Sequence, residues 1–118
     1  MSTQTISTAT ADHYTWGTPT ANCDGWHLLT SESLSVIEEL MPSCAREVRH
    51  YHTTARQFFY VLEGTLIMEI DGQIFTLPRA NSIQIEPGQM HQAENLSGSD
   101  VRMLVISQPA SHGDRVVV

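Results

Sequence analysis

Two histidines separated by one residue, His50 and His52, are the first feature of this sequence that could do chemistry. Alternate side chains of a β-strand point to the same face, so this spacing directs both imidazoles to one side of a sheet. Gln57 follows at the start of a β-prone run, and His91 comes shortly after the Pro-Gly turn at 87–88. Three imidazoles and one amide from at least three strands suit a single divalent metal ion. The sequence therefore predicts a metal site formed by these four residues.

Short β-prone segments separated by turns surround these positions. Asp71-Gly72 is a strong hairpin signal, and the alternation of Ile83 and Ile85 is typical of a half-buried strand. No helical segments are predicted between the strands, so the pattern indicates an all-β sandwich or barrel. The predicted strands are residues 26–29, 34–41, 47–52, 57–63, 65–71, 73–77, 82–86, a short segment from 91, and 101–107.

One segment has a competing interpretation. Residues 31–39 have a serine and glutamates where a helix would favour them, but Val36-Ile37 and the nearby Pro42 favour a strand. Residues 18–25 are rich in Pro, Asn, Asp and Gly and are predicted to be a loop. Residues 116–118 could pair at a sheet edge or with a neighbouring molecule.

Length and composition indicate one globular domain. The chain has 118 residues, of which 41% are hydrophobic and 16% charged, which is enough for one core and too short for two. Residues 1–12 lack periodicity and are predicted to be a flexible tail, followed by a single barrel domain over residues 13–118.

Charge and targeting signals limit the partners that we expect. The net charge is −7, and the six basic residues are all arginines without a cluster, so nucleic acid and anionic membranes are not expected partners. A small-molecule ligand or substrate is expected instead. The N-terminus does not resemble a signal peptide and no run is long enough to cross a membrane, so we expect a cytoplasmic protein. Cys23 and Cys44 are then expected to be reduced and mostly buried.

The strand that begins at Gln57 predicts an association surface. If Gln57 points inward, the residues that share its face are Phe59 and Val61. The opposite face then carries three large side chains that are too apolar to be left in water. We expect a symmetric homodimer to cover these outward residues, which are Phe58, Tyr60 and Leu62.

Two motifs in this order resemble those of the cupin superfamily, in particular its small single-domain (cupin 2-like) members. The first motif is matched by His50, His52, position 57 and Gly64. The second motif, a Pro-Gly turn followed by His and Asn, is matched by Pro87, Gly88, His91 and Asn95. The chain departs from the pattern at Gln57, where the family has an acidic ligand, and at Ala80-Asn81, where a glycine is common.

The resemblance implies a double-stranded β-helix, which is a jelly-roll-like barrel, with a metal ion near its open mouth. We therefore expect one divalent transition metal per chain, Zn, Ni, Fe or Mn, held by His50, His52, Gln57 and His91. Because Gln57 brings no negative charge, the centre would stay nearer +2 and act as a stronger Lewis acid. It is a poorer match to the two-histidine, one-carboxylate iron oxygenases. Small cupins that linearise unsaturated uronates resemble this set of ligands.

Three functions stay open at this point. The first is a metal-dependent enzyme that acts on a small polar or anionic substrate, carbohydrate-derived or an organic acid, by isomerase- or tautomerase-type Lewis-acid chemistry. The second is an iron-dependent dioxygenase, and the third is a non-catalytic barrel that binds a metal or small ligand. Catalytic candidates are Tyr60, Arg102, Glu94 and a metal-bound water. His13, His27 and His112 are predicted to be surface or packing residues, and Asn95 a turn residue.

Overall fold

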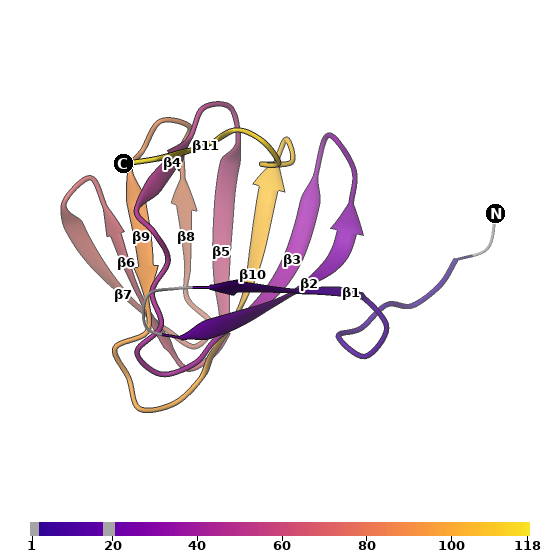
Figure 1. The fold of residues 1–118 in the computed structure, drawn as a ribbon, viewed down its shortest axis with the longest axis horizontal. Helices are drawn as coiled ribbons and strands as arrows, with labels where there is room; N and C mark the ends of the chain where they lie inside the picture. Colours follow the sequence, from indigo (N-terminus) through magenta and orange to yellow (C-terminus); the bar gives the residue numbers. More distant parts are fainter. Residues whose placement is uncertain (1–2, 18–20) are drawn as a thin grey trace.

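The computed structural model describes residues 3–17 and 21–118, which form eleven strands in two antiparallel sheets. The predicted all-β double-stranded β-helix is confirmed (Figure 1). Within the described ranges, no helix is long and apolar enough to cross a membrane. The larger sheet has the order β1 (Asp12–Gly17), β2 (Asn22–Thr30), β3 (Ser35–Met41), β10 (Val101–Gln108), β5 (Arg56–Glu63), β8 (Ser82–Ile85). The smaller has the order β11 (Arg115–Val117), β4 (His50–His52), β9 (His91–Glu94), β6 (Thr65–Ile70), β7 (Gln73–Pro78).

The N-terminal strands differ most from the prediction. β1 was not expected, and β2 begins at Asn22 instead of position 26. The predicted loop over 18–25 is therefore wrong from Asn22 onward, whereas positions 18–20 lie outside the described residues. The physical reason is that β2 pairs with β1 on one side and β3 on the other, and two ladders of backbone hydrogen bonds override the turn preference of Asn, Asp and Gly. The flexible tail over 1–12 stays a prediction, with Asp12 already in β1.

The structure also answers two questions that the sequence left open: whether residues 31–39 form a helix or a strand, and what the C-terminal residues pair with. The helix considered over 31–39 does not form, because Ser35–Met41 is β3, paired with β2 and β10. The strand predicted over 47–52 is reduced to β4, His50–His52, which pairs with β9 and with β11. The C-terminal residues 115–117 thus pair at a sheet edge within the same chain.

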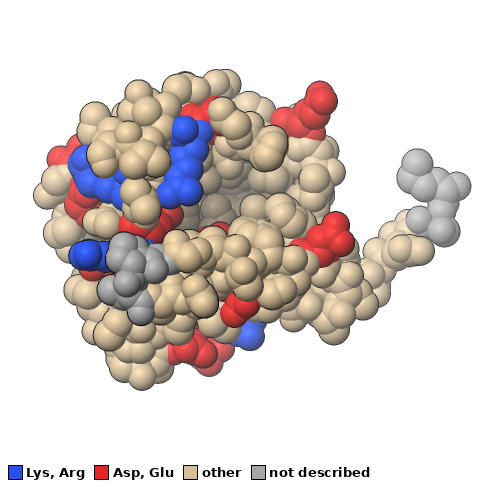
Figure 2. Space-filling model, in the orientation of Figure 1, with Lys and Arg blue, Asp and Glu red and all other residues tan. Residues whose placement is uncertain are grey.

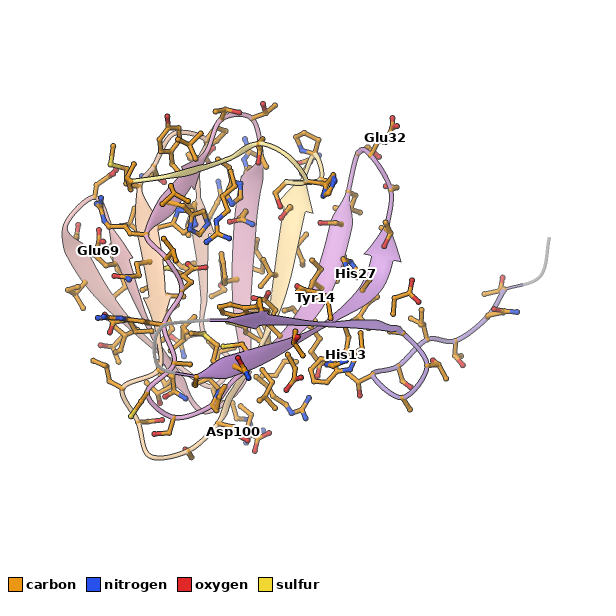
Figure 3. The ribbon with its side chains drawn as sticks, viewed as in Figure 1. His13, Tyr14, His27, Glu32, Glu69 and Asp100 are labelled. Atoms are coloured by element: carbon orange, nitrogen blue, oxygen red, sulfur yellow. The ribbon has the colours of Figure 1, made fainter. Side chains whose placement is uncertain are left out.

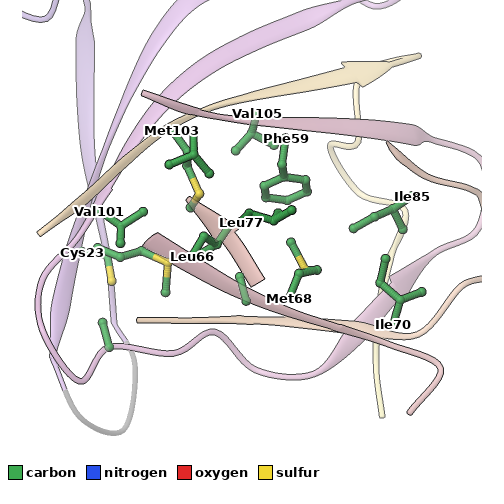
Figure 4. Packing of buried hydrophobic residues seen from close by; sticks show 14 residues of the cluster. Cys23, Phe59, Leu66, Met68, Ile70, Leu77, Ile85, Val101, Met103 and Val105 are labelled. Atoms are coloured by element: carbon green, nitrogen blue, oxygen red, sulfur yellow. The ribbon is translucent and has the colours of Figure 1, made fainter. Parts of the chain in front are cut away.

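The core lies between the two sheets and follows strand alternation. On β5, Phe59 and Val61 point inward, as expected, and on β10 the inward residues include Met103 and Val105. Figure 4 shows Phe59, Met103 and Val105 packed against residues of β6 and β7, such as Leu66 and Leu77. Burial of this apolar surface is the main stabilising contribution to the barrel.

The outer face of β5 carries the predicted apolar side chains. Phe58 is 36% exposed, and Tyr60 and Leu62 are partly buried. Dimerisation through this face stays a prediction.

Asn95 closes the turn that follows β9, as expected for a turn residue. Its side chain is fully buried, and Nδ2 donates to Met41 O at 2.9 Å and to Ser99 O at 2.8 Å. Its Oδ1 accepts from Ser97 N at 3.0 Å. The amide thereby ties the turn to the end of β3.

We expect Asn95→Ala to lower the free energy of unfolding by about 2–4 kcal/mol, because it removes a fully buried amide and its hydrogen bonds, including the buried one to Met41 O. Urea unfolding followed by circular dichroism would measure the loss. Asn81 is an exposed turn asparagine with one local hydrogen bond, so Asn81→Ala is the matched control, with an expected loss below about 1 kcal/mol. Equal losses in the two variants would contradict the structural role of Asn95.

Candidate metal centre

His50, His52 and His91 come together at one end of the smaller sheet. His50 and His52 share the inner face of β4, and His50 pairs directly with His91 on β9. The candidate ligand atoms of the three residues all lie within 4.8 Å of one another, and all three side chains are buried. The three imidazoles therefore lie together, as expected from the His-x-His spacing and from the turn before position 91.

Each ring of this histidine cluster donates its Nδ1–H to an oxygen. The acceptor for His50 is Val48 O at 2.7 Å, and the acceptor for His91 is Gln89 O at 3.0 Å. His52 donates to Asp114 Oδ1, also at 2.7 Å. These bonds fix the tautomer, because a neutral imidazole protonated on Nδ1 has its lone pair on Nε2. Three Nε2 atoms are thus available as ligands.

Gln57 faces the same interior from the larger sheet. Its Nε2 donates to Ser107 Oγ at 3.1 Å, which leaves Oε1 as the free ligand atom. Gln57 Oε1 and His91 Nε2 are two of the buried side-chain polar atoms that have no hydrogen-bond partner among the described residues. Buried acceptors without a donor are costly, and a metal ion would satisfy both. The residues present therefore fit a divalent cation.

Burial lowers the pKa of two of these histidines, His50 and His91. The pKa of His50 is lowered to about 3, mainly because burial disfavours the charged imidazolium, and the neighbouring His91 and Arg115 lower it further. Burial likewise lowers the pKa of His91. Neutral imidazoles are the form that binds a metal, so the lowered pKa values of His50 and His91 favour metal binding at neutral pH.

Asp114 orients His52 from the C-terminal segment. Burial alone would raise the pKa of Asp114, but hydrogen bonds from the Ala55 N–H, His52 and the Thr54 N–H lower it. The carboxylate is therefore held in place and charged. A carboxylate behind a ligating histidine raises the basicity of that ligand and fixes its ring.

A cavity of about 290 Å³ opens beside the histidines. Figure 2 shows it as a hollow in the face of the molecule, with basic side chains along its edge. Arg115 on β11 lines this pocket, and no carboxylate in the described part of the chain forms an ion pair with it. An arginine without such a partner, close to a candidate metal site, favours an anionic ligand.

Two glutamates, Glu39 and Glu47, line the same pocket. Burial raises the pKa of Glu39 to about 7, although a hydrogen bond from Tyr14 Oη to Glu39 Oε2 at 3.0 Å opposes the rise. Burial, and then the charge of Glu39, raises the pKa of Glu47 to about 8. Both carboxyl groups therefore hold a substantial share of their protons near neutral pH.

The catalytic candidates named from the sequence do not line this pocket. Tyr60, Arg102 and Glu94 alternate with inward residues on β5, β10 and β9, so their side chains leave the barrel interior. Arg102 instead pairs with Glu38 at 2.8 Å and lies over the Trp26 ring. Catalytic roles for these three residues stay predictions, while other titratable side chains, those of Glu39 and Glu47, line the pocket itself.

The other histidines lie apart from the cluster, as predicted. Figure 3 shows His13 and His27 with Tyr14 on the two strands at the front, β1 and β2. His13 Nε2 lies 2.8 Å from Asp24 Oδ1, and the His27 ring packs 4.9 Å from the Tyr14 ring. His112 is exposed.

The motifs of the sequence did not single out four residues that shape the site. Glu39 follows Glu38, and only the register of β3 shows which of the two faces the pocket. Tyr14 lies on a strand that was not expected. Asp114 and Arg115 belong to a C-terminal segment that was unassigned, and their roles follow from the pairing of β11 with β4. The adjacent acid and base, Asp114 and Arg115, just before the apolar residues 116–118, are the one local feature that marks this segment.

Comparison with known proteins agrees with this geometry. A family model described as "Cupin domain" matches residues 36–107. Uncharacterized protein MJ1618 of Methanocaldococcus jannaschii is 29% identical over 85 residues, which are 71% of this chain and 68% of that protein.

Two solved structures share the fold. KdgF from Halomonas sp. has a TM-score of 0.81 at 17% identity, over 94% of this chain and 97% of that one. A predicted oxalate decarboxylase from Thermotoga maritima also has a TM-score of 0.81, at 14% identity, over 91% of this chain and 100% of that one.

Removal of the carboxylate behind His52 is expected to weaken metal binding. Asp114→Ala should lower the affinity for Zn²⁺ by about 10- to 100-fold, because His52 loses its hydrogen-bond acceptor. Competition with a chromogenic chelator would measure this, beside Asp100→Ala as a control at an exposed acid. Unchanged affinity in Asp114→Ala would mean that Asp114 does not support the site.

The two half-buried glutamates, Glu39 and Glu47, are expected to make stability depend on pH. A carboxyl group whose pKa is higher in the folded state destabilises the fold as the pH rises from its unfolded pKa, about 4.5, through its folded pKa. In the metal-free protein, the stability of Glu39→Gln relative to the wild type should therefore increase as the pH rises from about 5 to about 8.

Urea unfolding at the two pH values would measure this difference, with Glu32→Gln as the exposed control. A stability difference between Glu39→Gln and wild type that is the same at both pH values would contradict the raised pKa of Glu39.

Proposed function

The chain belongs to the cupin family, and on that premise we propose that it is a metal-dependent enzyme that acts on a small anionic substrate by Lewis-acid chemistry of the isomerase or tautomerase type. The observation that carries this proposal is that a candidate metal site and an arginine lie at the same cavity. The histidine cluster and Gln57 form a neutral ligand set, and Arg115 lines the same cavity.

His50, His52, His91 and Gln57 would hold one divalent ion, through three Nε2 atoms and one Oε1. The ion would polarise a carbonyl or carboxylate oxygen of the substrate. A neutral ligand set leaves more of the positive charge on the centre than a set with a carboxylate does, which favours an anion and an enolate-like transition state.

The chain's own groups would position the substrate. Arg115 can bind a carboxylate through two parallel N–H donors. Phe59, Ile37 and Val105 line the cavity with apolar surface, which excludes water and strengthens each electrostatic contact. Glu39 and Glu47 are the acids of the pocket that can hold or accept a proton near neutral pH.

The first test is the metal content of the protein made without a histidine tag. Wild type should contain about one metal ion per chain, and the triple variant His50→Ala/His52→Ala/His91→Ala should contain none. The identity of the metal would separate iron from redox-inert ions. Absence of metal from wild type, even after incubation with Zn²⁺, Ni²⁺, Fe²⁺ or Mn²⁺, would overturn the proposal.

The second test measures exchange of the C3 hydrogens of 2-oxobutanoate in D₂O, followed by NMR. The loaded wild type should accelerate exchange at least about tenfold over the triple variant, without O₂. Gln57→Glu should retain metal but slow exchange, because the added negative charge weakens the Lewis acid. Metal-dependent O₂ consumption would favour the dioxygenase instead, and a loaded protein with no exchange and no O₂ consumption would favour the non-catalytic barrel.

A further inference from the structure

One end of the pocket, here called the inner end, is lined by Tyr14, Glu39 and Glu47. Part of it is built across three neighbouring strands, β1, β2 and β3. Tyr14 on β1 pairs with Gly25 on β2, and Gly25 pairs with Glu39 on β3. A Cβ atom on Gly25 would lie 2.2 Å from Tyr14 Cζ, so the tyrosine ring crosses β2 directly over the glycine. Its hydroxyl then reaches Glu39 Oε2 at 3.0 Å. The missing side chain at Gly25 allows Tyr14 to hold Glu39 in place.

Glu47 lines the same pocket from the segment that precedes β4. Its backbone N–H donates to Ala93 O at 3.0 Å, and its Oε1 accepts from Ala93 N at 2.9 Å, so both backbone and side chain are anchored to β9. Glu39 and Glu47 both line the pocket and interact electrostatically. Among the described residues, neither forms a salt bridge. The inner end is thus a pair of fixed carboxyl groups with a tyrosine hydroxyl.

An apolar band separates this inner end from the histidine cluster. Phe59, Val105 and Ile37 lie side by side on β5, β10 and β3, and all three line the pocket. Their row lies between the row of Gln57 and the row of Glu39. On β9, Ala93 lies two residues beyond His91, which is about 7 Å along a strand. The pocket therefore has a polar outer end, an apolar middle and a polar inner end.

We propose that Tyr14, Glu39 and Glu47 form a binding site for an uncharged hydroxyl group of the ligand. The ligand is then a hydroxy acid, with its carboxylate at the histidine cluster and Arg115 and its hydroxyl several carbons away. This inference rests on the proposed function for the position of the carboxylate, and it adds the group that the inner end recognises.

The chemistry of the inner end favours a hydroxyl over a charged group. A protonated carboxyl both donates and accepts hydrogen bonds, and a hydroxyl does the same. A second carboxylate on the ligand would be repelled by any ionised glutamate. An ammonium group would require the pair to ionise in a buried place, which the raised pKa values of Glu39 and Glu47 oppose. The apolar band suits the methylene groups between the two ends of the ligand.

Three probes of nearly equal length test this site on the metal-loaded protein: 6-hydroxyhexanoate, heptanoate and 6-aminohexanoate. They differ only in their terminal hydroxyl, methyl or ammonium group. Isothermal titration calorimetry should give about five- to tenfold tighter binding for 6-hydroxyhexanoate than for heptanoate, as expected for one added pair of hydrogen bonds. Binding of 6-aminohexanoate should not exceed that of heptanoate.

Two variants assign this preference to the inner end. Glu39→Leu should reduce the ratio of the two affinities to about one, and Tyr14→Phe, which retains the ring over Gly25, should reduce it at least twofold. Glu38→Leu is the matched control, because Glu38 lies on the same strand but faces outward to Arg102, and it should leave the ratio unchanged.

The other outcomes overturn the inference in distinguishable ways. Equal binding of 6-hydroxyhexanoate and heptanoate, with both weakened by Arg115→Gln, would reject the hydroxyl site while the proposed function stands. Tightest binding of 6-aminohexanoate would show an ionised pair that binds cations. Failure of all three probes to bind the loaded protein would remove the proposed anion site and this inference with it.

Discussion

Each buried imidazole of the histidine cluster depends on an oxygen acceptor for its Nδ1–H, since a buried donor without one costs roughly 1–3 kcal/mol. For His50 and His91 that acceptor is a backbone carbonyl two residues earlier, so the approach to the strand supplies it locally. His52 depends on Asp114, 62 residues later in the chain. The cluster is therefore complete only when β11 has paired with β4, and the C-terminal segment is part of the site and not an appendage to it.

The same strand faces build both the core and the pocket. On β10 the inward positions run from Val101 through Met103 and Val105 to Ser107, and only the last of these is polar. Ser107 accepts a hydrogen bond from Gln57 Nε2, and the amide oxygen of Gln57 has no hydrogen-bond partner among the described residues. A strand can thus change from core to site within two residues, because alternation brings each second side chain to the same interior and only the residue type differs.

Local patterns of the sequence predicted the parts of the site that local geometry determines. The spacing of His50 and His52 and the Pro-Gly turn before His91 set positions within single strands, and the structure brings these residues together. The inner end of the pocket depends on long-range register instead. Gly25 resembles a turn residue until β1 and β3 are paired on either side of it, and Glu38-Glu39 is ambiguous because a shift of one residue exchanges their faces. Arg115 likewise acquires its place from the pairing with His52.

The two polar ends of the pocket influence each other through the apolar band between them. Charges in a partly buried pocket are screened less than in solvent, and the positive charge of Arg115 lowers the pKa values of both Glu39 and Glu47. A dication at the histidine cluster would act in the same direction and favour ionised glutamates. A carboxylate bound at that end would cancel much of this charge and return the glutamates to their protonated form. Binding of a carboxylate at the histidine cluster would thus favour protonated glutamates, which can bind a hydroxyl group. By linkage, binding of the hydroxyl group would raise the affinity for the carboxylate by the same factor.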